Sequence, residues 1–88
     1  MLLEFYGREC IHCMKMAPVV DQLEKETGLK IERLETWHNQ ENAKKLKEYD
    51  KGICGGVPYF INTETNEAIC GEADLETLKK WALSKNEA

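Results

Sequence analysis

The sequence predicts an α/β fold in which three helices cover the two faces of one mixed four-stranded sheet. An apolar, strand-like run at residues 2–6 leads through a helical stripe at 11–27 to a second strand near 30–36, and such a crossover requires parallel pairing. A short turn near residue 65 separates two further strands, which must therefore pair antiparallel. The predicted order is β-α-β-α-β-β-α.

The first three elements follow from the spacing of apolar residues. Residues 2–6 are apolar on both faces of the strand except at Glu4. The following stretch carries apolar groups at helical intervals, and Gly28 is a typical C-terminal stop. Ile31 and Leu34 supply the weak apolar content of the second strand. The helical stripe consists of Cys13, Met16, Ala17, Val20 and Leu23.

A shorter helix and a hairpin are predicted next. Asn39 can cap a helix over residues 41–50, which Gly52 ends. Strands at 57–61 and 67–70 are joined by a tight turn rich in Thr and Asn.

The last element is a helix that begins after a glycine. Gly71 breaks the final strand and Asp74 can cap the helix that follows. The tail at 83–88 is expected to be frayed. The apolar stripe of this helix consists of Leu75, Leu78, Trp81 and Ala82.

Length and composition limit the classes of protein that fit. Eighty-eight residues, 42% hydrophobic and 32% charged, predict one globular domain. A net charge of −4 with dispersed basic residues argues against a nucleic-acid partner, and no apolar run is long enough to span a membrane. No basic segment or small-residue cleavage site precedes the first strand, so we expect a cytoplasmic protein that is not exported.

The cysteines favour a catalytic or metal-binding role over a structural disulfide framework. The four cysteines are Cys10, Cys13, Cys54 and Cys70. A disulfide framework fits small secreted proteins, and nothing here signals secretion. In a reducing cytosol, closely spaced thiols are more often catalytic or bound to metal.

Cys10 and Cys13 form the most informative pattern. Cys10 falls at the end of the first loop, and so at the N-terminus of the first helix, with Cys13 one turn inside. The partial positive charge and free N–H groups of that helix end favour a thiolate, most of all at the outer sulfur. The spacing also brings the two sulfurs within bonding reach. We therefore interpret Cys10 as an exposed nucleophile and Cys13 as a resolving thiol.

Two alternatives to a redox couple stay open. A zinc or iron–sulfur site would need a second such pair, and Cys54 and Cys70 lie apart on different predicted elements. Cys10 and Cys13 could also be inert structural cysteines. We favour the redox couple and expect no metal and no cofactor beyond a Cys10–Cys13 disulfide.

The chain resembles the thioredoxin superfamily over nearly its whole length. The resemblance rests on Leu3-Glu4-Phe5-Tyr6, Cys10-x-x-Cys13, Ala17-Pro18 and Gly56-Val57-Pro58, in the family's order and at similar separations. It implies a minimal thioredoxin fold and an enzyme that exchanges disulfides with protein substrates. It also implies a monomer that receives electrons from a thioredoxin-reductase-like donor or from glutathione.

The resemblance gives roles to two polar residues near the cysteines. Glu4 occupies the position of a buried acid beneath the inner cysteine, where a raised pKa would let it exchange a proton with Cys13. His12, immediately before Cys13, is similar to the histidine of disulfide isomerases and is expected to stabilise the Cys10 thiolate. Glu9 departs from the family pattern, since a carboxylate there opposes the thiolate, although Arg8 can partly neutralise it.

The loop before the third strand is the expected substrate-binding segment. The resemblance implies a cis Val57–Pro58 bond facing the cysteines, with the Val57 backbone free to pair with an extended substrate. Gly56 would let a substrate backbone approach closely. Gly71 lies in a segment, 70–74, similar to the glutathione-holding segment of glutaredoxins. That likeness makes a glutathione-dependent oxidoreductase the main alternative function.

The other two cysteines and an aromatic pair have less definite interpretations. Cys54 and Cys70 could form a second disulfide or a regulatory thiol pair, but we favour small buried hydrophobes. Trp37-His38 is interpreted as a contact at the rim of the site or a cover for the core.

Overall fold

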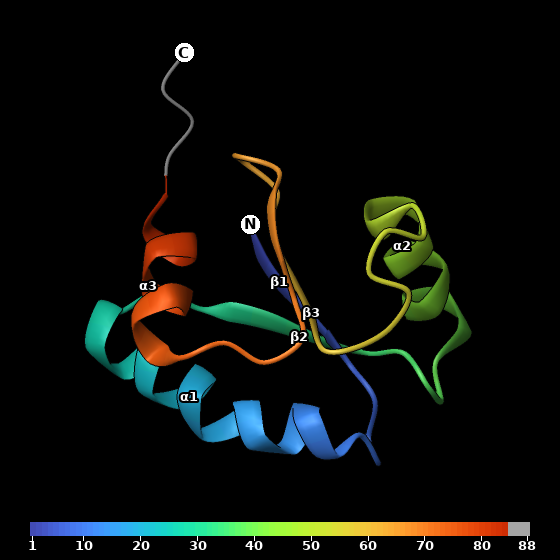
Figure 1. The fold of residues 1–88 in the computed structure, drawn as a ribbon, viewed down its shortest axis with the longest axis horizontal. Helices are drawn as coiled ribbons and strands as arrows, with labels where there is room; N and C mark the ends of the chain where they lie inside the picture. Colours follow the sequence, from blue (N-terminus) through green and yellow to red (C-terminus); the bar gives the residue numbers. More distant parts are fainter. Residues whose placement is uncertain (85–88) are drawn as a thin grey trace.

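The computed structural model describes residues 1–84, which fold into a four-stranded sheet with helices on both faces (Figure 1). The strands lie in the order β2-β1-β3-β4. β1 pairs parallel with β2 and antiparallel with β3, and β3 pairs antiparallel with β4. The predicted α/β class and element order are confirmed. The elements are β1 (Leu2–Tyr6), α1 (Ile11–Thr27), β2 (Ile31–Glu35), α2 (Gln40–Asp50), β3 (Tyr59–Asn62), β4 (Glu67–Cys70) and α3 (Leu75–Leu83).

The sheet separates two hydrophobic clusters. α1 and α3 cover one face, where Phe60 of β3 is fully buried and packs edge-on against Trp81. α2 covers the other face, where Phe5 of the central strand is fully buried (Figure 1). Because side chains alternate along a strand, Leu3 and Phe5 face α2, and Glu4 between them faces α1. Glu4 is therefore buried between the sheet and the layer of helices that contains α1.

Polar caps end the helices largely as predicted. The side chains of Asn39 and Asp74 accept backbone N–H bonds from residues three positions on, and Gly28 ends α1 in the left-handed region. α2 ends at Asp50, the predicted last residue, and its C-cap is Lys51 in the left-handed conformation, one residue before the predicted stop at Gly52.

The third strand begins later than predicted. Val57 and Pro58 precede β3, which starts at Tyr59 and extends to Asn62. Proline has no N–H for the ladder, so it stands before the strand rather than in it. The shift leaves Val57 in the loop, where its backbone is not consumed by the sheet.

The C-terminal end of α3 is tied to the sheet. The buried side-chain amide of Asn62 donates to the carbonyls of Trp81 and Ser84, at 3.1 and 3.3 Å. Of the tail predicted to be frayed, Leu83 belongs to the helix and Ser84 is its C-cap, and residues 85–88 lie outside the described residues. Within the described part of the chain, no helix is long and apolar enough to cross a membrane.

Candidate functional site

Cys10 and Cys13 occupy the first turn of α1. Cys10 is the N-cap of the helix, and its sulfur accepts the backbone N–H of Cys13 at 3.2 Å. Its own N–H donates to the carbonyl of Gly7 at 3.0 Å, which closes the loop that leaves β1. Both cysteines are free thiols and each is only 5% exposed. The predicted placement at the helix N-terminus is confirmed, but the prediction that Cys10 is exposed is wrong, since it is as buried as Cys13.

The cover over Cys10 comes from the loop before β3. The carbonyl oxygen of Val57 lies 3.9 Å from the Cys10 sulfur, and the Val57–Pro58 peptide bond is cis, as the resemblance implied. The N–H of Gly71 donates to the carbonyl of Pro58 at 2.8 Å. Gly56 is exposed beside them. Of the residues predicted to bind substrate, Val57 therefore contacts Cys10, and Gly71 is joined to the same loop through Pro58.

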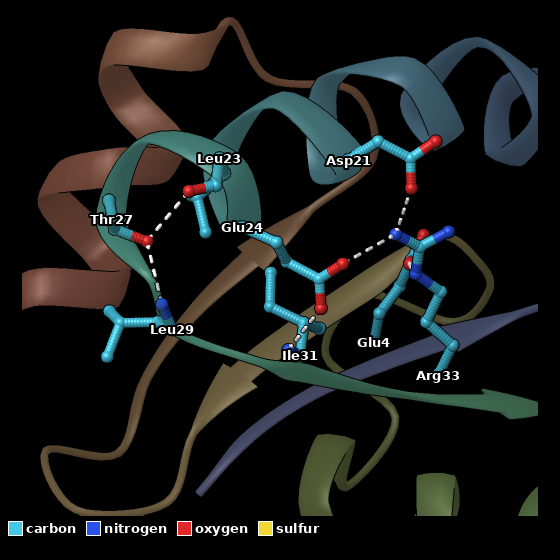
Figure 2. A network of polar contacts seen from close by, with 8 residues as sticks. All are labelled: Glu4, Asp21, Leu23, Glu24, Thr27, Leu29, Ile31 and Arg33. Atoms are coloured by element: carbon cyan, nitrogen blue, oxygen red, sulfur yellow. Dashed lines mark hydrogen bonds and ion pairs between the residues drawn. The ribbon is translucent and has the colours of Figure 1, made fainter.

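Glu4 lies buried beneath α1, with 3% of its surface exposed. Burial raises its pKa to about 7, although the Arg33 guanidinium pulls the pKa down. Arg33 is the neighbour of Glu4 on β2, and its Nε lies 3.9 Å from the Glu4 carboxylate. Figure 2 shows why Arg33 neutralises Glu4 only in part: the guanidinium is shared with Asp21 and Glu24 of α1, at 2.6 and 3.2 Å.

Glu4 and Cys13 face a common cavity. The cavity has a volume of about 210 Å³ and is also lined by Gly7, Ala17 and Arg33. Burial, and after it the hydrogen bond with Cys10, raise the pKa of the Cys13 thiol to about 12, and the charge of Glu4 adds to this. An acid with a pKa near neutrality thus shares a cavity with a thiol that holds its proton firmly.

His12 is turned toward a carboxylate from the other end of the chain. Its Nδ1 lies 2.6 Å from the carboxylate of Glu72, in the segment between β4 and α3. Both side chains are exposed. The structure thus shows a partner for His12 that competes with the predicted interaction at Cys10. Glu9 is likewise paired with His38, at 2.7 Å, rather than with Arg8.

Glu35 joins the loop before Cys10 to the loop after β2, a role that sequence reasoning missed. Its carboxylate accepts the backbone N–H groups of Arg8, Trp37 and His38 at 2.7–3.1 Å. Burial alone would raise the pKa of Glu35, but these hydrogen bonds outweigh it and lower the pKa. A glutamate at a strand end carries no motif, so no sequence signal marked it.

Trp37 completes the contact between these two loops. A Cβ added to Gly7 would lie 2.2 Å from the indole, so the ring rests directly on the backbone of Gly7. The side chain is still 54% exposed. Its interpretation as a contact at the rim of the site agrees with this position.

Cys54 and Cys70 form a disulfide, which corrects the interpretation that we favoured from the sequence. Their Cα atoms are 5.7 Å apart, and they are separated by 16 residues. Cys70 is exposed and Cys54 half-buried, so neither is a wholly buried hydrophobe. Cys70 pairs with Tyr59 across the β3–β4 hairpin. Tyr59 directly follows the loop that contains Cys54, so this pairing brings the two cysteine-bearing segments together.

Within residues 1–84, no group of three or more His, Cys, Asp or Glu side chains is arranged to hold a metal ion. The expectation of a metal-free protein remains a prediction. Comparison of the chain with protein-family models and with the curated proteins found no match.

Proposed function

We propose that this protein is a thiol–disulfide oxidoreductase of the thioredoxin superfamily, with Cys10 as nucleophile and Cys13 as resolving thiol. The observation that carries the proposal is the N-cap position of Cys10, whose sulfur receives a backbone N–H one turn from a second free thiol. A hydrogen bond from an N–H group stabilises an anionic sulfur more than a neutral one.

In the reducing direction the reaction has two exchange steps. The Cys10 thiolate attacks one sulfur of a protein disulfide, which forms a mixed disulfide and releases the other substrate sulfur as a thiolate that takes a proton from water. Cys13 loses its proton and attacks the Cys10 sulfur, which closes a Cys10–Cys13 disulfide and releases the second substrate sulfur as a thiolate that takes a proton from water. Two electrons pass from the cysteine pair to the substrate.

Glu4 supplies the base for the second step. The pKa of Cys13, about 12, lies far above that of Glu4, about 7, so proton transfer between the resting groups is strongly unfavourable. The transfer therefore accompanies attack, when the developing thiolate is consumed in the new sulfur–sulfur bond. Glu4 accepts the proton directly or through water in the shared cavity.

The oxidised pair must be reduced again before the next cycle. A dithiol protein of the reductase type or two molecules of glutathione would supply the two electrons, in a reducing compartment such as the cytoplasm. Substrate would be held against the Val57 backbone as an added strand, beside Gly56 and Gly71.

Reduction of insulin disulfides tests the proposal. With dithiothreitol as electron donor, we expect the wild type to accelerate the reaction and Cys10→Ser to abolish the acceleration. Cys13→Ser should accumulate a mixed disulfide at Cys10. Cys54→Ser/Cys70→Ser, which removes two other cysteines, is the matched control and should retain activity. Acceleration that persists in Cys10→Ser would overturn the assignment.

The same assay distinguishes the alternatives. Glutathione with its reductase as the sole donor should support turnover only if the enzyme is glutathione-dependent. Metal analysis of the purified protein tests the alternative of a zinc or iron–sulfur carrier, which would hold stoichiometric metal on Cys10 and Cys13.

A further inference from the structure

We propose that Cys54–Cys70 is a second thiol–disulfide exchange site, separate from the Cys10–Cys13 pair, whose oxidation state controls access to Cys10. Exchange at Cys54–Cys70 does not depend on the proposed function. The claim that this exchange controls an enzymatic nucleophile at Cys10 does rest on the proposed function.

The second site opens on the opposite face of the sheet from α1. Cys70 and Cys54 line a cavity of about 640 Å³ between the end of α2 and the β3–β4 hairpin. Tyr49, Tyr59 and Ala68 form its walls. Because Cys70 is an exposed residue that also lines this cavity, we expect a thiol from solution to reach its sulfur without unfolding of the domain.

The disulfide fastens the loop that covers Cys10. Residues 51–57 connect α2 to Pro58, and the exposed Ile53, Gly55 and Gly56 contribute little packing. The first part of the loop is held by the covalent bond to Cys70 and by hydrogen bonds to Asp50. The N–H groups of Cys54 and Gly55 donate to the Asp50 carboxylate at 2.7 and 2.9 Å, and the N–H of Ile53 donates to the Asp50 carbonyl at 3.1 Å.

The far end of the same loop reaches the first site. Val57, three residues after Cys54, places its carbonyl 3.9 Å from the Cys10 sulfur. Pro58 is then bonded to Gly71, the residue directly after Cys70. The disulfide and this hydrogen bond link the loop to the end of β4. Reduction would remove the covalent link and leave this hydrogen bond, the bonds to Asp50 and the packing of Val57 on the core.

The exchange balances as an ordinary two-electron reduction by a dithiol. One thiolate of the reductant attacks the sulfur of Cys70, the more exposed of the two residues, which forms a mixed disulfide and releases Cys54 as a thiolate that takes a proton from water. The second thiol of the reductant attacks its own partner sulfur, closes the reductant's disulfide and releases Cys70 as a thiol. Reduction frees the loop to open, so that Cys10 becomes more accessible.

Alkylation of a Cys13→Ala variant tests the proposal without any protein substrate. This variant keeps Cys10 but cannot form the Cys10–Cys13 disulfide. Its Cys54–Cys70 bond is equilibrated with graded ratios of reduced and oxidised dithiothreitol. We expect reversible reduction, followed by mass spectrometry of the alkylated thiols, while circular dichroism stays that of the folded protein.

The second measurement is the rate at which iodoacetamide alkylates Cys10. We expect it to rise about threefold or more when Cys54–Cys70 is reduced, because the opening of a local segment becomes easier. Backbone hydrogen exchange in residues 51–57 should rise in parallel. Cys54→Ser/Cys70→Ser and Cys54→Ala/Cys70→Ala, each in the Cys13→Ala background, should both reproduce the reduced state.

Two outcomes would overturn the proposal. One is a Cys54–Cys70 bond that is reduced only when the domain unfolds. The other is an alkylation rate at Cys10 that is the same in the oxidised, reduced and substituted proteins. Neither result bears on insulin reduction, so failure of this proposal and failure of the oxidoreductase assignment remain distinguishable.

Discussion

A carboxyl group buried beneath the first helix has a measurable thermodynamic signature. The folded protein raises the pKa of Glu4 from 4.5 to about 7, so between these values the folded state binds a proton that the unfolded chain has released. The contribution of Glu4 to stability is therefore fully present below pH 4.5 and is lost as the pH rises through about 7. The loss amounts to about 3 kcal/mol.

Glu4→Gln should remove this pH dependence. We expect the unfolding free energy of the variant, relative to wild type, to rise by about 3 kcal/mol between pH 4.5 and 8, measured by urea denaturation. Other titrating groups are common to both proteins and cancel in the comparison. Glu32→Gln, an exposed glutamate on β2, is the control and should track the wild type. Equal pH profiles for wild type and Glu4→Gln would contradict the buried, proton-holding role.

In the proposed reaction, the same substitution should also have a kinetic consequence. Glu4→Gln should slow release of the mixed disulfide by about 100-fold, the usual size of a general-base contribution, and leave the first attack by Cys10 nearly unchanged. Rapid mixing with a peptide disulfide, followed by acid quenching, separates the two steps. An equal loss in both steps would show that Glu4 acts on the structure of the site rather than on proton transfer.

Arg33 determines how far the pKa of Glu4 can rise. Its guanidinium lowers that pKa, and it is itself held by Asp21 and Glu24. Arg33→Gln should therefore raise the pKa of Glu4 further above 7, which moves the pH dependence of mixed-disulfide release to higher pH. Arg33→Lys, which keeps the charge, is the matched control. A carboxyl titration by NMR that shows the same pKa in Arg33→Gln and wild type would contradict this.

At the scale of elements, the sequence predicts most of the fold because the local signals agree with one another. The helix over 11–27 has its stripe, its cap and its glycine stop, and the structure reproduces these bounds. The predicted start of the third strand at Val57 is two residues too early. Val57 and Pro58 are apolar like strand residues, but the ladder requires N–H groups, which proline lacks.

In the candidate site too, features set by local sequence could be predicted and long-range side-chain pairings could not. The positions of Cys10 and Cys13 follow from local order in the chain, as does the inward direction of Glu4 within an apolar strand. The partners of His12 and Glu9 lie 60 and 29 residues away, and no spacing rule reaches that far. Side-chain pairing across loops depends on tertiary placement, which local patterns do not encode.

The contact between the two loops at the site can be tested through Gly7. Gly7→Ala would drive a methyl group into the Trp37 indole, so we expect a loss of about 1–3 kcal/mol in unfolding free energy. Trp37→Ala in the same chain should remove most of that loss, because the obstacle is gone. A double-mutant cycle from urea denaturation measures the coupling. Additive effects would show that the indole does not constrain Gly7.

At the scale of the whole molecule, the Cys54–Cys70 disulfide could not be chosen from the sequence alone. Two cysteines 16 residues apart are equally compatible with free thiols in different elements. The β3–β4 register decides the matter, because it places Cys70 opposite Tyr59 and so beside the loop that contains Cys54. Their Cα separation of 5.7 Å lies in the usual range for a disulfide.

This disulfide should also contribute to global stability, since it closes a loop of intermediate length in the unfolded chain. For a loop of about 15 residues the loss of unfolded-chain entropy is worth about 3 kcal/mol, a large part of the stability of a small domain. We expect Cys54→Ser/Cys70→Ser to unfold at correspondingly lower urea concentration. Dithiothreitol should lower the wild type to the same midpoint and leave the double variant unchanged. If dithiothreitol destabilised both proteins equally, the effect would have to originate elsewhere, because the double variant has no Cys54–Cys70 bond to lose.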